Sequence, residues 1–384
     1  MRQNLFLTFV AMTMAVCPGA MAQSGQKPTD GSSYYIRNVY TKQYLCQDGK
    51  GRVMLWASGT PLTLQSIPNS NVGTYYLLDS SDKLSATVPE RLLSNGGMYE
   101  EWTFTAAEKG TYNVALRNSG VNAYTYLEYS DLTGDVLRNP LAPSASDQKA
   151  QWKFVSANDY VVPTLTLKED TTSYSRPIGT FNVLFQRSLA LNMWNTLCCP
   201  FPISAEQLRE QFGDDCVLLK FIGATNETID FTPAERAEAG IPYLLWPTKA
   251  ASDNTNYEFN NVSGFAEAPT DVRQGKITFI GTFVKGTVPA RAYVWSQNKL
   301  YHLTREMDLY GFRCYMWDDA TVQSKLSNWT IGGSTAIDGI VESFDTKPYD
   351  IYNLNGQKVK TNATSLDGLP SGLYIVNGKK VVKR

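Results

Sequence analysis

One pattern of short apolar stretches occurs three times between residues 34 and 158. Each copy opens on an apolar stretch that contains at least one tyrosine, and the three openings lie at 34–39, 73–79 and 110–118. The second and third copies end on Trp-x-Phe, so that Trp102 and Phe104 fall on the same face of a strand. A unit of about 40 residues with four short strands cannot bury its own apolar face, but three units can share one interior. The repeat therefore predicts an all-β barrel with threefold symmetry.

The motifs of this repeat resemble those of the ricin-B-like β-trefoils. That family opens on Tyr-x-Ile-x-Asn, continues with Gly-Lys-x-Leu and closes on Gln-x-Trp-x-Phe. The opening is present at 34–38 and two Trp-x-Phe closings are present, but no glutamine stands two residues before Trp152. The first copy has Leu-Thr-Leu at 62–64 in place of a closing motif. The resemblance covers about a third of the chain and implies a β-trefoil-like domain over 34–158.

The same resemblance implies a place for a carbohydrate. Sugar sites combine an exposed aromatic ring with amide or carboxylate groups that reach the sugar hydroxyls. By analogy with ricin-like trefoils, Trp56 is the candidate ring, and Asp48 and Gln47, just after the second strand of the first copy, are the candidate hydroxyl partners. The alternative is structural: Trp56 packs in the barrel, and Asp48 forms a turn with Gly49.

Residues 1–22 have the pattern of a signal peptide. Arg2 supplies a positive charge, residues 5–16 are mostly apolar, and residues 20–22 form the small-x-small sequence that a signal peptidase cleaves. The apolar run is shorter than the roughly 20 residues that a membrane-spanning helix needs. We therefore expect export, followed by a polar linker at 23–33. A lipidated Cys17 is the alternative, which the valine before it disfavours.

A second linker is expected at 159–175 and a β-rich domain at 176–335. One helix is predicted in this domain, because Ser204 and Gln207 form a capping box, and Gly213 follows the apolar pair Leu208 and Phe212. Three phrases resemble a β-rich domain common in surface and secreted proteins of the Bacteroidota, which has no defined activity. They lie at 194–201, 239–244 and 311–315.

The C-terminal segment, 345–384, contains two similar hairpin patterns. Each has a strand, an Asn-Gly turn and a second strand, at 349–359 and at 369–384. The segment resembles the C-terminal sorting domain of type IX secretion substrates, including the Gly-x-Tyr-Ile-Val motif and the basic end. The resemblance implies delivery to the cell surface by the secretion machinery. A purely structural pair of hairpins is the alternative.

Little in the sequence indicates catalysis. The single histidine, His302, lies in a strand pattern, and no protease motif surrounds Cys198 or Cys199, so that a cysteine–histidine dyad is disfavoured. Residues 79–82 (Asp-Ser-Ser-Asp) bind calcium only weakly if at all, because such residues in turns bond their own backbone. We predict no catalytic residue, no metal and no cofactor. A glycosidase stays open, because its two carboxylates need not be close in sequence.

The five cysteines outside the signal peptide do not form a disulfide framework. Their number is odd and their spacing matches no metal site. Adjacent Cys198 and Cys199 would face opposite sides of a strand. We interpret the cysteines as small buried apolar residues, with a bridge from Cys198 or Cys199 to Cys216 or Cys314 as the alternative.

The chain has 35 basic and 36 acidic residues, and this balance gives no reason to expect a nucleic-acid partner. No segment after the signal peptide is long and apolar enough to cross a membrane. Together these features predict an exported binding protein, secreted or on the outer surface, that recognises a glycan or a surface protein as a lectin or adhesin does. A structural or partner-binding surface component without a sugar site is the first alternative, and a secreted hydrolase is the second.

Overall fold

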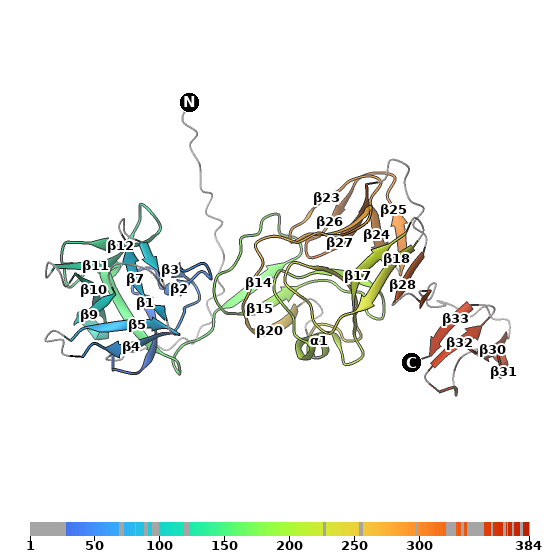
Figure 1. Cartoon of the computed structure of the whole chain (residues 1–384), viewed down its shortest axis with the longest axis horizontal. Helices are drawn as coiled ribbons and strands as arrows, with labels where there is room; N and C mark the ends of the chain where they lie inside the picture. The colour runs from blue at the N-terminus through green and yellow to red at the C-terminus, as the bar shows by residue number, and fades with distance from the viewer. Residues whose placement is uncertain are drawn as a thin grey trace, which may run out of the picture. The chain divides into compact units, whose positions relative to one another are not determined.

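The computed structural model describes residues 28–383, except for 69–72, 81, 88–90, 94–99, 119–122, 226–227, 253–255, 297, 320–327, 332–333, 336–348, 355, 364–365, 367, 371 and 377–378. The predicted signal peptide and both predicted Asn-Gly turns fall wholly or partly outside these residues. The chain divides into two compact units, 1–161 and 162–384. Apart from helix α1 and two short 3-10 helices, the regular structure is strand (Figure 1), which confirms the all-β prediction.

Each of the three repeats in the first unit supplies two barrel strands and a hairpin between them, and the second repeat has one additional short strand, β6. The first holds β1 (Ser33–Asn38), β2 (Tyr44–Gln47), β3 (Arg52–Trp56) and β4 (Leu62–Ser66). The second holds β5 (Tyr75–Asp79), β6 (Asp82–Lys83), β7 (Ser85–Thr87), β8 (Arg91–Leu93) and β9 (Glu101–Ala106). The third holds β10 (Tyr112–Asn118), β11 (Ala123–Ser130), β12 (Asp135–Asn139) and β13 (Gln151–Ser156). The 3-10 helices η1 (Glu108–Gly110) and η2 (Gln148–Ala150) precede β10 and β13.

The outer strands of the three repeats form a closed barrel. Antiparallel pairing runs from β1 to β4, β5, β9, β10 and β13, and β13 pairs with β1 again. The register repeats as well, because the pairs Tyr34–Leu62, Tyr75–Trp102 and Tyr112–Trp152 are equivalent in the three copies. The inner hairpins β2–β3, β7–β8 and β11–β12 lie together, with β3 paired to β8 and β12 beside both. This is the β-trefoil arrangement.

The barrel interior is apolar and shared by all three repeats. Trp102 and Trp152 are completely buried, and their indole N–H groups donate to the carbonyls of Leu84 (2.9 Å) and Leu127 (3.0 Å). Leu62 occupies the equivalent position in the first repeat and has no polar atom to satisfy. A leucine is therefore an acceptable substitute at this position, which explains why the first copy lacks a Trp-x-Phe motif.

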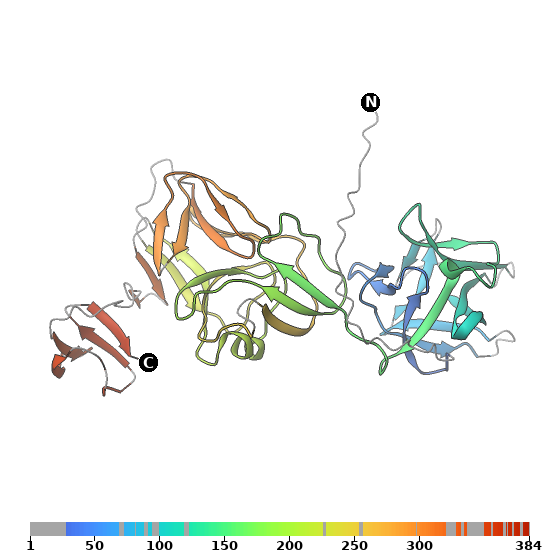
Figure 2. The ribbon, with the colours of Figure 1, turned by 180° about the vertical axis from the view of Figure 1, so that it is seen from behind.

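The second unit contains several small sheets (Figure 2). One consists of β14 (Thr164–Lys168), β15 (Phe181–Gln186) and β20 (Asn256–Val262). Another has the order β16 (Asn195–Cys198), β19 (Pro242–Trp246), β17 (Val217–Ala224), β18 (Thr228–Pro233), β28 (Asn328–Ile331) and β29 (Ser334–Thr335). A third has the order β21 (Val272–Gln274), β22 (Ile277–Gly281), β27 (Cys314–Asp318), β24 (Tyr293–Ser296) and β25 (Lys299–His302), and β23 (Gly286–Val288) pairs with β26 (Met307–Leu309).

Two local predictions for this unit are confirmed. Helix α1 (Ala205–Phe212) begins at a capping box in which Gln207 N donates to Ser204 Oγ (3.2 Å) and Ser204 N donates to Gln207 Oε1 (3.0 Å). The strand pattern of residues 291–303, which turns at residues 296–298, predicts a hairpin, and it is present as β24 and β25. Residues 159–175, which we expected to be a linker, instead include β14, which pairs in parallel with β15.

The C-terminal segment forms a four-stranded antiparallel sheet in the order β31 (Lys358–Ala363), β30 (Tyr349–Asn353), β32 (Gly372–Val376) and β33 (Lys379–Lys383). Both expected hairpins are present as β30–β31 and β32–β33, and the pairing of β30 with β32 joins them. Ile351, Tyr374, Val376 and Val381 form a small buried cluster on this sheet.

The glycine at position 281 allows the close approach of β22 to Cys198. A Cβ atom on Gly281 would lie 2.3 Å from Cys198 Sγ. We expect Gly281→Ala to destabilise the second unit by about 1–3 kcal/mol through overpacking, and Cys198→Ala in the same chain to recover part of the loss. Urea unfolding measures both. Gly286→Ala is the control, because open space surrounds that position. Equal losses of unfolding free energy in Gly281→Ala and Gly286→Ala would contradict this account.

Candidate ligand-binding site

Four side chains form a row on the outer face of the trefoil barrel. Lys153 of β13 is directly opposite Arg37 of β1, which is opposite Tyr44 of β2, which is opposite Trp56 of β3. Opposite residues of antiparallel strands project on the same face of the sheet. The neighbours of these residues along each strand, such as Ile36, alternate into the core. Two cations and two aromatic rings therefore line up across four adjacent strands.

The middle of this row is held by a cluster of tyrosines. The rings of Tyr35 and Tyr160 are stacked with centroids 3.5 Å apart, and the edge of Tyr44 meets Tyr160 at 5.2 Å. The Tyr160 hydroxyl accepts a hydrogen bond from Gly59 N (3.0 Å). Burial raises the pKa of both Tyr35 and Tyr44 above the usual tyrosine range. Arg37 adds a cation–π contact, with Cζ 5.7 Å from the centroid of the Tyr44 ring.

Trp56 lies on the outer side of its hairpin and is half-buried. Val53 and Leu55 of the same strand are buried in the trefoil core, so alternation along β3 turns Trp56 away from the core. The hairpin itself is fixed to β12, because Arg52 Nη2 is 2.6 Å from Asp135 Oδ2 and Leu55 N donates to Asp135 Oδ1 (3.3 Å). The candidate ring therefore lies on an anchored strand.

Asp48 and Gln47 do not lie beside Trp56. Asp48 Oδ1 accepts hydrogen bonds from the backbone N–H groups of Lys50 (2.7 Å) and Arg52 (3.1 Å), and Gln47 Oε1 accepts from Gly49 N (2.8 Å). Gln47 is opposite Val53, three residues along the hairpin from Trp56 and therefore about 10 Å away. Both side chains stabilise the turn between β2 and β3, as the structural alternative for Asp48 expects.

A basic hollow lies at the other end of the row. It has a volume of about 190 Å³ and is lined by Arg37, Asn38, Val39, Lys42 and Lys153. Arg37 Nε donates to the Lys42 carbonyl (2.9 Å), and the Lys42 ammonium donates to the Val39 carbonyl. Burial, and then the charges of Arg37 and Lys153, lower the pKa of Lys42. Because Lys153 of β13 lies far in the sequence from Arg37 of β1 and Lys42 of the loop after β1, no local motif indicated this hollow.

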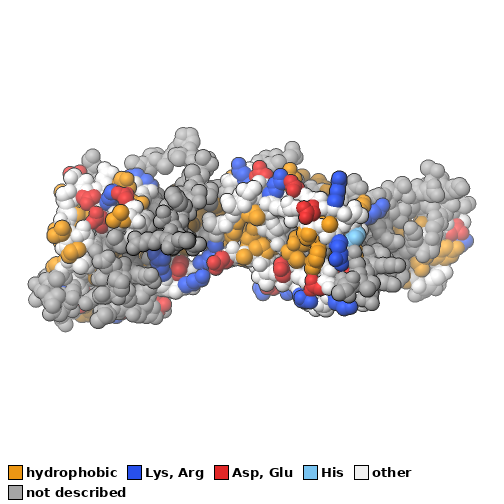
Figure 3. All heavy atoms as spheres, turned by 90° about the horizontal axis from the view of Figure 1, so that it is seen from above, with side chains coloured by type: hydrophobic (Ala, Val, Ile, Leu, Met, Phe, Trp, Pro, Cys, Tyr) orange, Lys and Arg blue, Asp and Glu red, His pale blue; other side chains and the backbone are white. Residues whose placement is uncertain are grey.

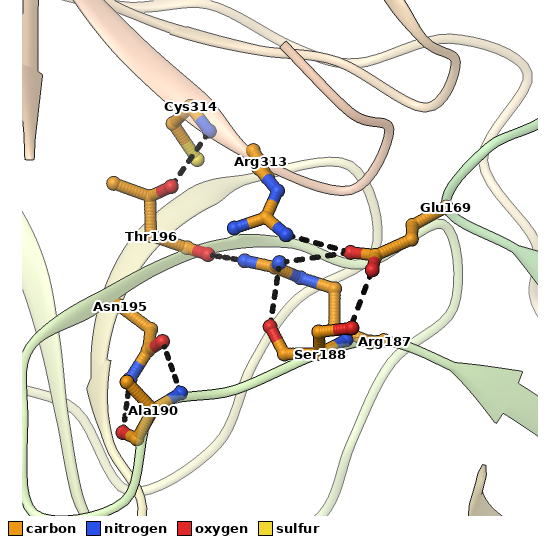
Figure 4. Close-up of polar contacts among 8 residues, drawn as sticks. All are labelled: Glu169, Arg187, Ser188, Ala190, Asn195, Thr196, Arg313 and Cys314. Carbon is orange, nitrogen blue, oxygen red and sulfur yellow. Dashed lines mark hydrogen bonds and ion pairs between the residues drawn. The ribbon is translucent and has the colours of Figure 1, made fainter. Parts of the chain in front are cut away.

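The second unit contains a buried ionic centre, drawn in Figure 4. Arg187 is completely buried and lies 3.3 Å from Glu169 Oε2, and Arg313 Nη2 lies 2.8 Å from the same oxygen. Arg187 also donates to the backbone carbonyls of Ser188 (3.3 Å) and Thr196. Burial, and then the charge of Arg313, lower the pKa of Arg187 to about 9, so that it remains a cation at neutral pH. The contacts join β14, β15, β16 and β27, which indicates a structural role.

Cys198, Cys199 and His302 lack the surroundings of an activated cysteine–histidine pair. Cys198 and Cys199 are buried, and burial raises the pKa of both thiols, whereas a nucleophilic cysteine needs a lowered pKa. His302 is exposed on β25, with its ring centroid 5.0 Å from that of Tyr293. The five described cysteines are all free thiols, and four are buried, in agreement with their interpretation as small apolar residues.

Among the described residues, no three His, Cys, Asp or Glu side chains gather as they would around a metal ion. Within the same residues, no helix has the length and apolarity to span a membrane. Basic and acidic side chains are interspersed over the viewed face of the second unit, as Figure 3 shows.

Comparison with known proteins finds no matching family model and no matching curated protein. Among solved structures, a ricin B-like lectin of Macrolepiota procera in complex with lactose is 15% identical over 34% of this chain and 99% of its own, with a TM-score of 0.27. The Rhizoctonia solani agglutinin is 16% identical over 34% and 99%, with a TM-score of 0.26. Cry35Ab1 is 10% identical over 76% and 88%, with a TM-score of 0.27. The trefoil assignment rests on the strand pairing of the barrel.

The ionic centre of the second unit gives a prediction. Glu169→Gln leaves Arg187 buried without its countercharge, and we expect a loss of about 3–5 kcal/mol of unfolding free energy in urea. Glu258→Gln, which changes an exposed carboxylate on β20, is the control. The prediction is wrong if the two variants lose the same free energy.

The same carboxylate predicts a pH dependence. Burial raises the pKa of Glu169, but hydrogen bonds from Ser188 and the charges of Arg313 and Arg187 outweigh it, so the pKa lies below its ordinary value of 4.5. Its stabilising contribution is therefore complete above that value and is lost as the pH falls through the lower folded-state pKa. We expect the unfolding free energy of the second unit, measured with urea, to fall in the native chain as the pH drops through that window. In Glu169→Gln it should fall much less.

Proposed function

We propose that this chain is an exported binding protein whose trefoil domain holds a saccharide on the outer face of β1, β2 and β3. The observation that supports the proposal is the row formed by Arg37, Tyr44 and Trp56 together with Lys153. A half-buried indole ring offers a flat apolar surface to one face of a sugar ring. Arg37, two strands away from the indole, and Lys153 beyond it can donate hydrogen bonds to hydroxyl oxygens. The hollow at the end of the row gives a ligand a concave place to lie.

Asp48 and Gln47 have a smaller part in this proposal than Trp56. Their side-chain oxygens hold the turn between β2 and β3, so their effect on a ligand would pass through the shape of the hairpin. Trp56, Arg37 and Lys153 are the groups that we propose to touch the saccharide, whereas Tyr44 is 8% exposed and packs against Tyr160.

Alanine substitution of the ring tests the proposal. On a glycan array with the full chain, we expect Trp56→Ala to weaken saccharide binding at least about tenfold, which corresponds to about 1.4 kcal/mol. Its thermal unfolding should change little, because the ring lies outside the barrel core. Asn139→Ala is the matched control, since Asn139 is opposite Tyr126 in the third repeat as Trp56 is opposite Tyr44 in the first. If Trp56→Ala binds saccharides as well as the native chain does, the proposed saccharide site on this face is wrong.

A second candidate function is the binding of a protein partner. Leu132, in the turn between β11 and β12, is 97% exposed, and Leu141 is 73% exposed. Exposed leucines of this kind are better suited to contact an apolar surface of a partner protein than to contact a sugar. If the array shows no saccharide bound, cross-linking of the full chain on cells, compared with Leu132→Ser, would test the partner interface.

We also propose that the C-terminal sheet directs delivery to the cell surface. It has a hydrophobic cluster of its own, with Ile351 and Tyr374 buried in it. In a bacterium with type IX secretion machinery, we expect a chain ending at residue 344 to be retained in the periplasm, and the full chain to reach the surface. Surface labelling of intact cells measures the difference. Equal labelling of the two chains would favour a purely structural tail.

A further inference from the structure

The junction between the third and the first repeat differs from the other two junctions, because only there do two cations face each other. Threefold equivalence follows from the barrel register, in which Arg37 faces Lys153, Leu78 faces Thr63 and Ala115 faces Thr103. The fold therefore accepts neutral residues at this pair of positions in two of the three repeats. Like charges directly opposite on a sheet are destabilising. The barrel needs no cations here, so the pair of cations where β13 meets β1 calls for a reason other than folding.

The three cations converge on one concave place. Arg37, Lys42 and Lys153 all line the hollow of about 190 Å³, from two adjacent strands and the loop after β1. The Arg37 guanidinium is oriented by its bond to the Lys42 carbonyl and by the Tyr44 ring. Lys42 is held by the Val39 carbonyl, and the neighbouring charges disfavour its protonated form. A bound anion would relieve this repulsion among the three cations.

We propose that this hollow binds the sulfate or carboxylate group of an acidic saccharide. The inference rests on the proposed saccharide site and names the chemical class of its ligand. A planar guanidinium with two ammonium groups matches an oxyanion, since charge-assisted hydrogen bonds to such groups are the strong ones. The row continues from Arg37 to Tyr44 and Trp56, so a sugar ring carrying the anion would extend toward the indole.

A nucleic acid is the less favoured source of an oxyanion. Proteins that track a phosphate backbone present an extended basic surface, whereas this chain has a formal net charge of −1. The three cations are gathered at one hollow, which suits a single anionic group. Binding of RNA is therefore an outcome that the experiment must distinguish.

The test uses two variants that copy residues found at the equivalent positions. Arg37→Leu introduces the residue at 78, and Lys153→Thr introduces the residue at 63 and 103. Binding of the full chain to chondroitin sulfate, hyaluronate, neutral dextran and single-stranded poly(U) RNA is measured by calorimetry at two salt concentrations. The sulfated and the carboxylate-only polymers separate the two sources of the anion. Lys83→Ala, which removes a cation from the second repeat, is the charge-matched control.

We expect each of the two variants to weaken binding of an acidic polymer at least tenfold and to reduce its salt dependence, while Lys83→Ala changes it less than threefold. Acidic polymers bound equally well by Arg37→Leu, Lys153→Thr and the native chain would overturn the proposal. Binding of neutral saccharides alone, lost in Trp56→Ala, would also overturn it and leave the proposed function standing. If no saccharide binds, both the proposed function and this inference are wrong. If poly(U) binds more tightly than any saccharide and its binding depends on Arg37, the ligand is a nucleic acid.

Discussion

The antiparallel pairing of β13 with β1 is the interaction on which the first unit depends. It joins the last strand of the third repeat to the first strand of the first repeat over five residue pairs, and so removes the free edges of the barrel. Only a closed ring lets three small units share one interior, in which Trp152 and Phe154 are completely buried. The same pairing brings Lys153 opposite Arg37, so the closure of the barrel also assembles the basic end of the candidate site.

The threefold barrel leaves the outer face free to vary. Interior positions must fill a common volume, and they hold Leu45, Leu84 and Leu127 at equivalent places in the three repeats, all fully buried. Exterior positions are not subject to this requirement, because their neighbours are solvent and the adjacent strands. The junction of the third and first repeats can therefore carry two facing cations, Arg37 and Lys153, while the other two junctions keep neutral residues at the equivalent positions. The asymmetry of the outer face is the feature that points to a ligand.

In the second unit, an ionic centre links strands of three separate sheets. Glu169 follows β14, Arg187 follows β15, and Arg313 precedes β27, so the contacts link segments distant in the sequence. Removing one partner of such a centre is costly because a charge remains buried. Close to these arginines in the sequence, the fully buried rings of Phe185 and Phe312 have their centroids 4.9 Å apart. Glu169 lies within the segment that the sequence suggested was a linker.

Sequence alone was sufficient for those features that depend on neighbouring residues. The strand repeats, the capping box at Ser204 and the hairpin of β24 and β25 follow from alternation and local hydrogen bonding, which operate over a few residues. The trefoil was predictable because repetition reveals a shared interior. The alignment of Lys153, Arg37, Tyr44 and Trp56 was decided only by tertiary structure, since closure of the barrel sets its register. For the same reason Asp48 and Gln47, close to Trp56 in sequence, lie about 10 Å along the hairpin from it.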